Sequence, residues 1–124
     1  MSSEITVDTP QVGLLVKAPS AAMPLDVMRQ RADEAVALLR SVGSTNRLMI
    51  LCQLVEEERS VSQLVDALGQ SQSVVSQHLA VLRREAMVVG RRDGQSIHYR
   101  IADDRVRVLM QTLFQLFCHP DDKV

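Results

Sequence analysis

The chain has 124 residues and an almost balanced charge, with 14 Lys and Arg against 15 Asp and Glu. Hydrophobic residues make up 46% of it, which suffices for one modest core and excludes a wholly disordered protein. The net charge of -1 excludes a uniformly basic surface, so a nucleic-acid interface would have to be a local patch. No apolar run approaches the ~20 residues of a membrane span, and the N-terminus carries acidic residues where a signal peptide would be basic. We therefore expect a cytoplasmic protein with no membrane partner.

Composition divides the chain into three segments. Residues 1–23 mix Ser, Thr, Pro and Ala, and we expect a flexible N-terminal tail there. Residues 24–119 carry periodic apolar patterns and are expected to form one folded domain. Residues 120–124 are expected to be a short C-terminal tail.

Four helical patterns follow in chain order. Apolar residues recur at three- and four-residue spacing from Leu25 to about Val42, and again after a cap at Ser44 or Thr45. Two shorter patterns come next, one capped by Ser60 or Ser62 and ending at Gly69, and one capped by Ser71 and covering 72–85. Two short helices joined by a Gly-containing turn, the second with an uncovered polar face, predict a helix-turn-helix.

The pattern then becomes extended. Residues 87–92 are β-branched and basic, and Asp93-Gly94 after them is a hairpin turn signal. Residues 96–101 alternate like a strand, with Ile97, Tyr99 and Ile101 on one face. Asp103 and Asp104 favour the start of a last helix, which Pro120 would end. The predicted fold is mainly α with a small β-hairpin, in the order α-α-α-α-β-β-α. It is a winged helix-turn-helix, expected to form a homodimer.

The polar face of the second short helix and the basic hairpin suit double-stranded operator DNA as a partner. Gln can make a bidentate contact to adenine, Ser can serve bases or phosphates, and Arg supplies phosphate contacts. An ordinary solvated face is the alternative for the arginines. The predicted DNA-binding residues are Gln72, Ser73, Ser76, Gln77, His78, Arg83, Arg84, Arg91, Arg92, Gln95 and Ser96. No phosphate loop, paired catalytic carboxylates or nucleophile elbow is present, so we do not expect an enzyme or any catalytic residue.

Residues 38–99 resemble the ArsR/SmtB family of winged-helix repressors. The resemblance rests on the segments 39–48 (LRSVGSTNRL), 71–83 (SQSVVSQHLAVLR) and 88–100 (VVGRRDGQSIHYR). Members usually have a proline where this chain has Ser44-Thr45-Asn46. The resemblance implies a dimer built by the first and last helices, and operator binding that an effector weakens. Apolar residues on those two helices fit such an interface: Leu25, Met28, Val36, Leu109, Leu113 and Phe117.

Many family members sense metals, but the ligand clusters that this needs are missing from the sequence. We therefore expect no metal and no cofactor. Cys52 and Cys118 instead resemble, in position and spacing, the sensing cysteines of the persulfide-responsive (SqrR/BigR-like) subgroup and of the related HlyU-type regulators. The resemblance implies a repressor that releases DNA when reactive sulfur species bridge the two cysteines, with sulfide-detoxification genes as targets.

Four alternatives to this sensing mechanism remain open. The effector could be peroxide or disulfide stress, a metal ion, or haem bound at Cys118-His119, or the two cysteines could be unrelated buried thiols. A thiolate at Cys118 would be disfavoured by the negative end of its helix dipole, which favours Cys52 as the first nucleophile.

Overall fold

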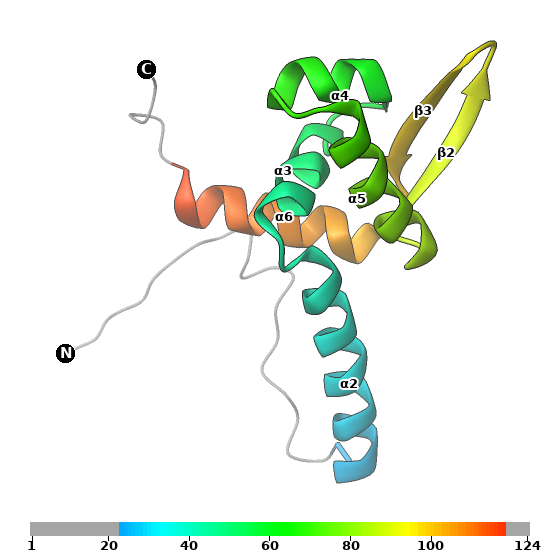
Figure 1. Ribbon diagram of the computed structural model, residues 1–124. Coiled ribbons are helices and arrows are strands. Elements are labelled where there is room, and N and C mark those ends of the chain that lie inside the picture. Colours follow the sequence, from blue (N-terminus) through cyan, green and yellow to red (C-terminus); the bar gives the residue numbers. More distant parts are fainter. Residues whose placement is uncertain (1–22, 119–124) are drawn as a thin grey trace. The chain divides into compact units, whose positions relative to one another are not determined.

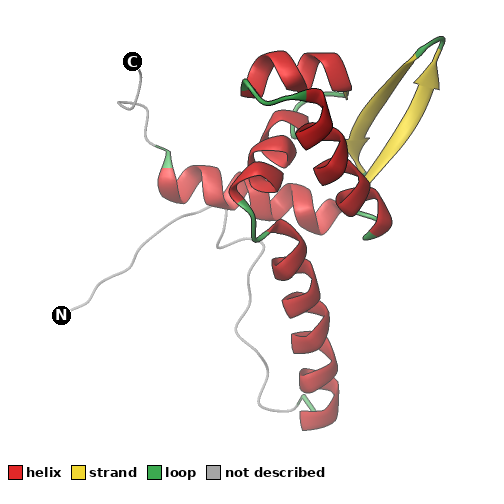
Figure 2. Cartoon of the chain, in the orientation of Figure 1, coloured by secondary structure: helices red, strands yellow, loops and turns green. Residues whose placement is uncertain are grey.

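The computed structural model describes residues 23–118 (Figure 1). These residues form five helices and three strands. The helices are α2 (Leu25–Val42), α3 (Thr45–Leu54), α4 (Val61–Leu68), α5 (Gln72–Arg84) and α6 (Asp104–Phe117). The strands are β1 (Arg59–Ser60), β2 (Val88–Asp93) and β3 (Ser96–Ile101). The predicted winged helix-turn-helix is confirmed, with α4 and α5 as the helix pair and β2–β3 as the wing, drawn in yellow in Figure 2.

Contacts divide the chain into two compact units, residues 1–33 and 34–124, and the division falls inside α2. The sequence instead suggested a boundary after residue 23. The two expected tails lie outside the described residues, apart from Met23, and so do His119 and Pro120.

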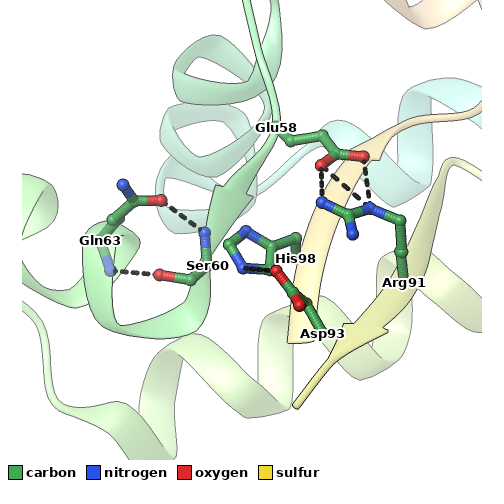
Figure 3. A network of polar contacts seen from close by, with 6 residues as sticks. All are labelled: Glu58, Ser60, Gln63, Arg91, Asp93 and His98. Atoms are coloured by element: carbon green, nitrogen blue, oxygen red, sulfur yellow. Dashed lines mark hydrogen bonds and ion pairs between the residues drawn. The ribbon is translucent and has the colours of Figure 1, made fainter. Parts of the chain in front are cut away.

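Polar side chains begin four of the helices by accepting a hydrogen bond from a free backbone N–H of the first turn. The N-caps are Ser44, Ser60, Ser71 and Asp103, which accept from the backbone N–H of Arg47, Gln63, Val74 and Arg105. At α4 the Gln63 side chain also accepts from the backbone N–H of Ser60, which completes a capping box (Figure 3). The structure thus selects Ser60 over Ser62 as the cap.

The core lies where α3, α4, α5 and α6 meet the inner face of the wing. Its fully buried side chains are Ile50, Leu51, Leu54, Leu64, Val75, Leu79, Leu82, Val106 and Met110. Tyr99 and Ile101 are buried from β3, and Ile97 packs against the same cluster, so the predicted inner face of this strand is confirmed. Leu and Val dominate because the chain has few aromatic residues to fill the space.

The sheet has one strand that the sequence did not predict. Residues Arg59 and Ser60 pair antiparallel with Tyr99 and His98, which gives three strands in the order β1-β3-β2. The hairpin turn also lies one residue later than expected, because Asp93 still pairs with Ser96 and the loop is Gly94-Gln95. Gly94 has φ +66° while Gln95 does not have a positive φ, as in a type II′ hairpin turn.

Several large apolar side chains remain exposed on α2 and α6. On α2 these are Leu25, Met28, Val36 and Leu39, and on α6 they are Phe114, Leu116 and Phe117. Leu109 and Leu113, which the sequence assigned to a dimer surface, are partly buried and also pack against the core of their own chain. The large apolar side chains that are exposed on α6 lie toward the end of the helix.

Candidate nucleic-acid interface and cysteine pair

The recognition helix α5 presents its polar residues to solvent. Gln72, Ser73, Ser76 and Gln77 are exposed, while Val75 and Leu79 on the opposite side are buried. Arg83 and Arg84 are exposed in the last turn and follow Ser76 and Gln77 by seven residues, so they extend the same stripe. One face of α5 thus offers amides and hydroxyls along the helix and two guanidinium groups at its end.

His78 differs from the other predicted residues of α5, because it is half-buried and turned toward α3. Its Nδ1 lies 3.5 Å from Nη1 of Arg47 on α3. The same arginine donates from Nε to the Ser41 carbonyl oxygen at 2.6 Å and from Nη2 to the Arg40 carbonyl oxygen at 3.5 Å. Arg47 therefore links the last turn of α2 to the recognition helix, a role that sequence reasoning missed because it depends on how three helices pack together.

The wing arginines lie on opposite faces of β2. Arg92 is paired with Ile97 in the strand register and shares the inner face with it, whereas Arg91 is paired with His98 on the outer face. Arg91 is also held by Glu58, with Nη2 donating to Oε1 at 2.7 Å and Nε 3.3 Å from both carboxylate oxygens (Figure 3). The Arg91 guanidinium keeps the pKa of Glu58 below its usual value. Sequence reasoning grouped the two arginines and did not identify Glu58.

An open groove of about 450 Å³ brings four of the predicted DNA-binding residues together. Gln72 and Ser76 line it from α5, and Gln95 and Ser96 line it from the wing tip. Its remaining lining residues come from the β1–α4 segment and from β3: Ser60, Val61, Ser62, Val65, Asp66, Ile97 and Tyr99. The groove therefore joins the helix-turn-helix and the wing into one surface with both polar and apolar residues.

The two cysteines are exposed, which contradicts the alternative of two buried thiols. Cys52 is on α3 and Cys118 directly follows α6, and these two helices are in contact. Although the Cys52 side chain is exposed, neighbouring atoms partly desolvate its thiol and raise its pKa, and negative charge on the nearby Cys118 raises that pKa further. A raised pKa reduces the thiolate fraction at neutral pH, so the expectation that Cys52 reacts first gains no support from its surroundings.

Arg107 provides a further connection between α3 and α6. Its guanidinium donates from α6 to the carbonyl oxygen of Val55, the residue that caps the C-terminus of α3.

Within residues 23–118, no group of three or more His, Cys, Asp or Glu side chains is placed to hold a metal ion. None of the helices in that range is both long enough and apolar enough to cross a membrane.

Comparison with known proteins decides the family. Residues 44–88 match the model of the bacterial regulatory proteins of the arsR family. Over 98 residues the chain is 39% identical to the transcriptional activator HlyU of Vibrio cholerae. The aligned residues cover 79% of this chain and 91% of HlyU. The chain belongs to the arsR family.

Other members of the arsR family agree with this assignment. The biofilm growth-associated repressor of Agrobacterium fabrum is 37% identical over 102 residues, which cover 82% of this chain and 87% of that protein. The structure of reduced HlyU from Vibrio cholerae has a TM-score of 0.74 at 38% identity and covers 77% of this chain and all of that one. BigR from Xylella fastidiosa has a TM-score of 0.72 at 37% identity, over 78% of this chain and 99% of that one.

These relatives are named as regulators of transcription, and they include both an activator and repressors. The chain is therefore a DNA-binding transcription regulator of the arsR family with a winged helix-turn-helix fold, and not an enzyme.

Proposed function

We propose that this regulator is a repressor whose affinity for operator DNA falls when reactive sulfur species bridge Cys52 and Cys118. The observation that carries the proposal is the pair of exposed thiols on two contacting helices, close enough for one to raise the pKa of the other. Exposure lets a small sulfur donor reach both thiols, and proximity lets the second thiol resolve the adduct formed on the first. Genes of sulfide detoxification are the proposed targets.

The bridge forms by thiol exchange with a persulfide donor. A cysteine thiolate attacks the outer sulfur of the donor, and the donor's thiolate leaves. The resulting cysteine persulfide takes a second sulfur in the same way, and the other cysteine then attacks the middle sulfur and expels hydrosulfide. Two thiols and two persulfides thus give one trisulfide, two donor thiols and one hydrogen sulfide. The two cysteines are oxidised by two electrons, and the expelled sulfur atom is reduced.

Bridge length offers a basis for discriminating between oxidants. A direct disulfide needs Cα atoms within about 7 Å, and each inserted sulfur extends the reach by roughly 2 Å. A pair held beyond easy disulfide distance would accept a polysulfide bridge and resist peroxide.

The signal would travel through α3. This helix packs against α5 as well as α4 and α6, so a covalent link from Cys52 to the end of α6 constrains the support of the recognition helix. Coupling of about 1–3 kcal/mol would lower operator affinity by about 5- to 150-fold.

The DNA-binding form is proposed to be a homodimer. Its interface would bury the exposed apolar side chains of α2 and α6, including Leu39, Phe114 and Phe117, which a monomer would leave in water. Two recognition helices would then read half-sites about one DNA turn apart, through the polar face of α5 and the wing. Light scattering of the reduced protein should give the mass of a dimer at micromolar concentration, and a monomer mass would contradict this arrangement.

The sensing mechanism can be tested on operator DNA selected from a random-sequence pool with the reduced protein. Reduced protein is treated separately with a persulfide donor and with peroxide, and DNA affinity and intact mass are measured. We expect the persulfide to lower affinity and to add sulfur between Cys52 and Cys118, with peroxide having much less effect.

Cys52→Ser and Cys118→Ser serve as matched controls. Each should bind the operator as tightly as the wild type and lose the response to persulfide. If the double variant still releases DNA on persulfide treatment, the cysteine mechanism is wrong. Equal release by peroxide, through a direct disulfide, would instead assign the protein to general redox sensing.

A further inference from the structure

The outer face of the wing carries an ion pair that spans the central strand of the sheet. Glu58 lies just before β1 and Arg91 lies on β2, while β3 runs between these strands with His98 in register with Arg91. Arg91 engages Glu58 through both Nε and Nη2 (Figure 3). His98 Nε2 lies 3.9 Å from Asp93 Oδ2 on the same face.

The fold does not depend on this ion pair. The wing is already joined by the paired strands β2 and β3, and the inner face of β3 is anchored in the core. The Arg91 side chain is 54% exposed and that of Glu58 is 30% exposed, and ion pairs at such positions contribute little to stability. The ion pair is therefore more important for the ability of Arg91 to bind other groups than for stability.

A guanidinium binds a phosphate with the same N–H groups that it presents to a carboxylate. While Nε and Nη2 of Arg91 point at Glu58, they are not available to a DNA backbone. Arg92 on the opposite face of the strand provides the contrast, because it forms no ion pair with any described residue. Two adjacent arginines of the wing thus differ, because Arg91 is paired with a carboxylate and Arg92 is not.

We propose that Glu58 competes with a DNA phosphate for Arg91 and thereby holds the affinity of the regulator for DNA below what its wing could reach. The inference rests on the proposed contact between the wing and DNA. It assigns to Glu58 a role opposite to that of the DNA-binding residues, since removing its charge should strengthen binding. Arg91 must release Glu58 before its Nε and Nη2 edge can contact a phosphate.

The experiment measures binding to a fluorescein-labelled duplex of fixed sequence and roughly 30 base pairs, or about three helical turns. An arbitrary sequence suffices because phosphate contacts do not depend on the bases. Affinity is measured from about 50 to 200 mM salt for the wild type, for Glu58→Gln, Arg91→Ala and Arg92→Ala, and for the two double variants that combine Glu58→Gln with each arginine substitution. Glutamine keeps the shape of the side chain and removes its charge, and thermal unfolding verifies that each variant is folded.

We expect Glu58→Gln to raise affinity about two- to five-fold at low salt and to steepen the dependence of log affinity on log salt by about 0.9, one added phosphate contact. In the Arg91→Ala background the same substitution should change neither quantity. In an Arg92→Ala background, the matched control, it should act as strongly as in the wild type.

Two results would overturn the inference. Either Glu58→Gln leaves affinity and salt dependence unchanged, or it raises affinity equally with Arg91 absent, which would make Glu58 a distant repulsive charge. The outcome is separable from that of the wing contact. If Arg92→Ala weakens DNA binding and Glu58→Gln has no effect, only the proposed competition is refuted. If neither Arg91→Ala nor Arg92→Ala changes DNA binding, the proposed contact between the wing and DNA is refuted.

Discussion

The C-terminus of the recognition helix contains an alanine where glycine is favoured, and its replacement should stabilise the protein. Ala86 has φ +61° and is the non-glycine residue with positive φ among residues 23–118. The Met87 N–H donates to the Leu82 carbonyl at 2.9 Å, and the Ala86 N–H donates to the Arg83 carbonyl at 3.0 Å. These two bonds define a Schellman motif, in which the left-handed position normally holds glycine.

The effect of Ala86→Gly has two opposing terms. The left-handed conformation costs an L-residue roughly 1–2 kcal/mol, which glycine avoids. Glycine loses more backbone entropy on folding, which costs about 0.5–1 kcal/mol. Ala86 is exposed, so the substitution removes no buried methyl group. The balance is a stabilisation of about 0.5–1 kcal/mol, or a rise in melting temperature of roughly 2–6 °C for a domain of this size.

The assay is thermal and urea unfolding at one fixed protein concentration, because association would make the midpoint depend on concentration. Ala80→Gly is the matched control, since it makes the same replacement inside α5, where glycine should destabilise by about 1 kcal/mol. The two variants should therefore shift the midpoint in opposite directions. If Ala86→Gly lowers stability as Ala80→Gly does, the reasoning from the left-handed backbone is wrong.

Three further predictions concern α5, Arg47 and the start of α6. Gln77→Ala should lose about 1–3 kcal/mol of preference for the selected operator over other DNA, whereas Arg92→Ala should weaken binding to every sequence, as competition assays would show. Arg47→Ala should destabilise the fold by about 1–3 kcal/mol in urea unfolding, because it removes a charged donor from the Ser41 carbonyl. Asp103→Ala should cost about 1 kcal/mol as a lost N-cap, and Asp103→Asn should cost less. Because the Arg105 hydrogen bond lowers the pKa of Asp103, its ionic contribution is present above the unfolded pKa of about 3.9 and is lost as pH falls through the folded value. The Asn variant should lack that loss in acid unfolding curves.

Local patterns in the sequence determined most of the secondary structure. The bounds of α2 match the apolar periodicity, and α4 and α5 begin after serines that the sequence marks as caps. These features were predictable because a cap and its acceptor lie within three residues of each other, and a helical face repeats within one or two turns. The alternation of β3 likewise identified its buried face. The expectation that Cys52 and Cys118 act together came from the family resemblance. The two residues are too far apart in the sequence for a local pattern to connect them.

Tertiary structure alone decided which side chains are available for contact. The two-residue strand β1 is too short to have a period, and its pairing with β3 is set by the packing of the wing. Arg91 and Glu58 are 33 residues apart, so the sequence could count their charges but could not pair them. His78 has the spacing of a DNA-facing residue, yet Arg47 from another helix lies against its ring. Residue 86 adopts a left-handed conformation although it is an alanine. Leu82 and Met87 on either side of the turn are both buried, and the hydrogen bonds of the Schellman motif end the helix between these two residues. In each case the outcome depends on atoms brought together by folding, and no local propensity contains that information.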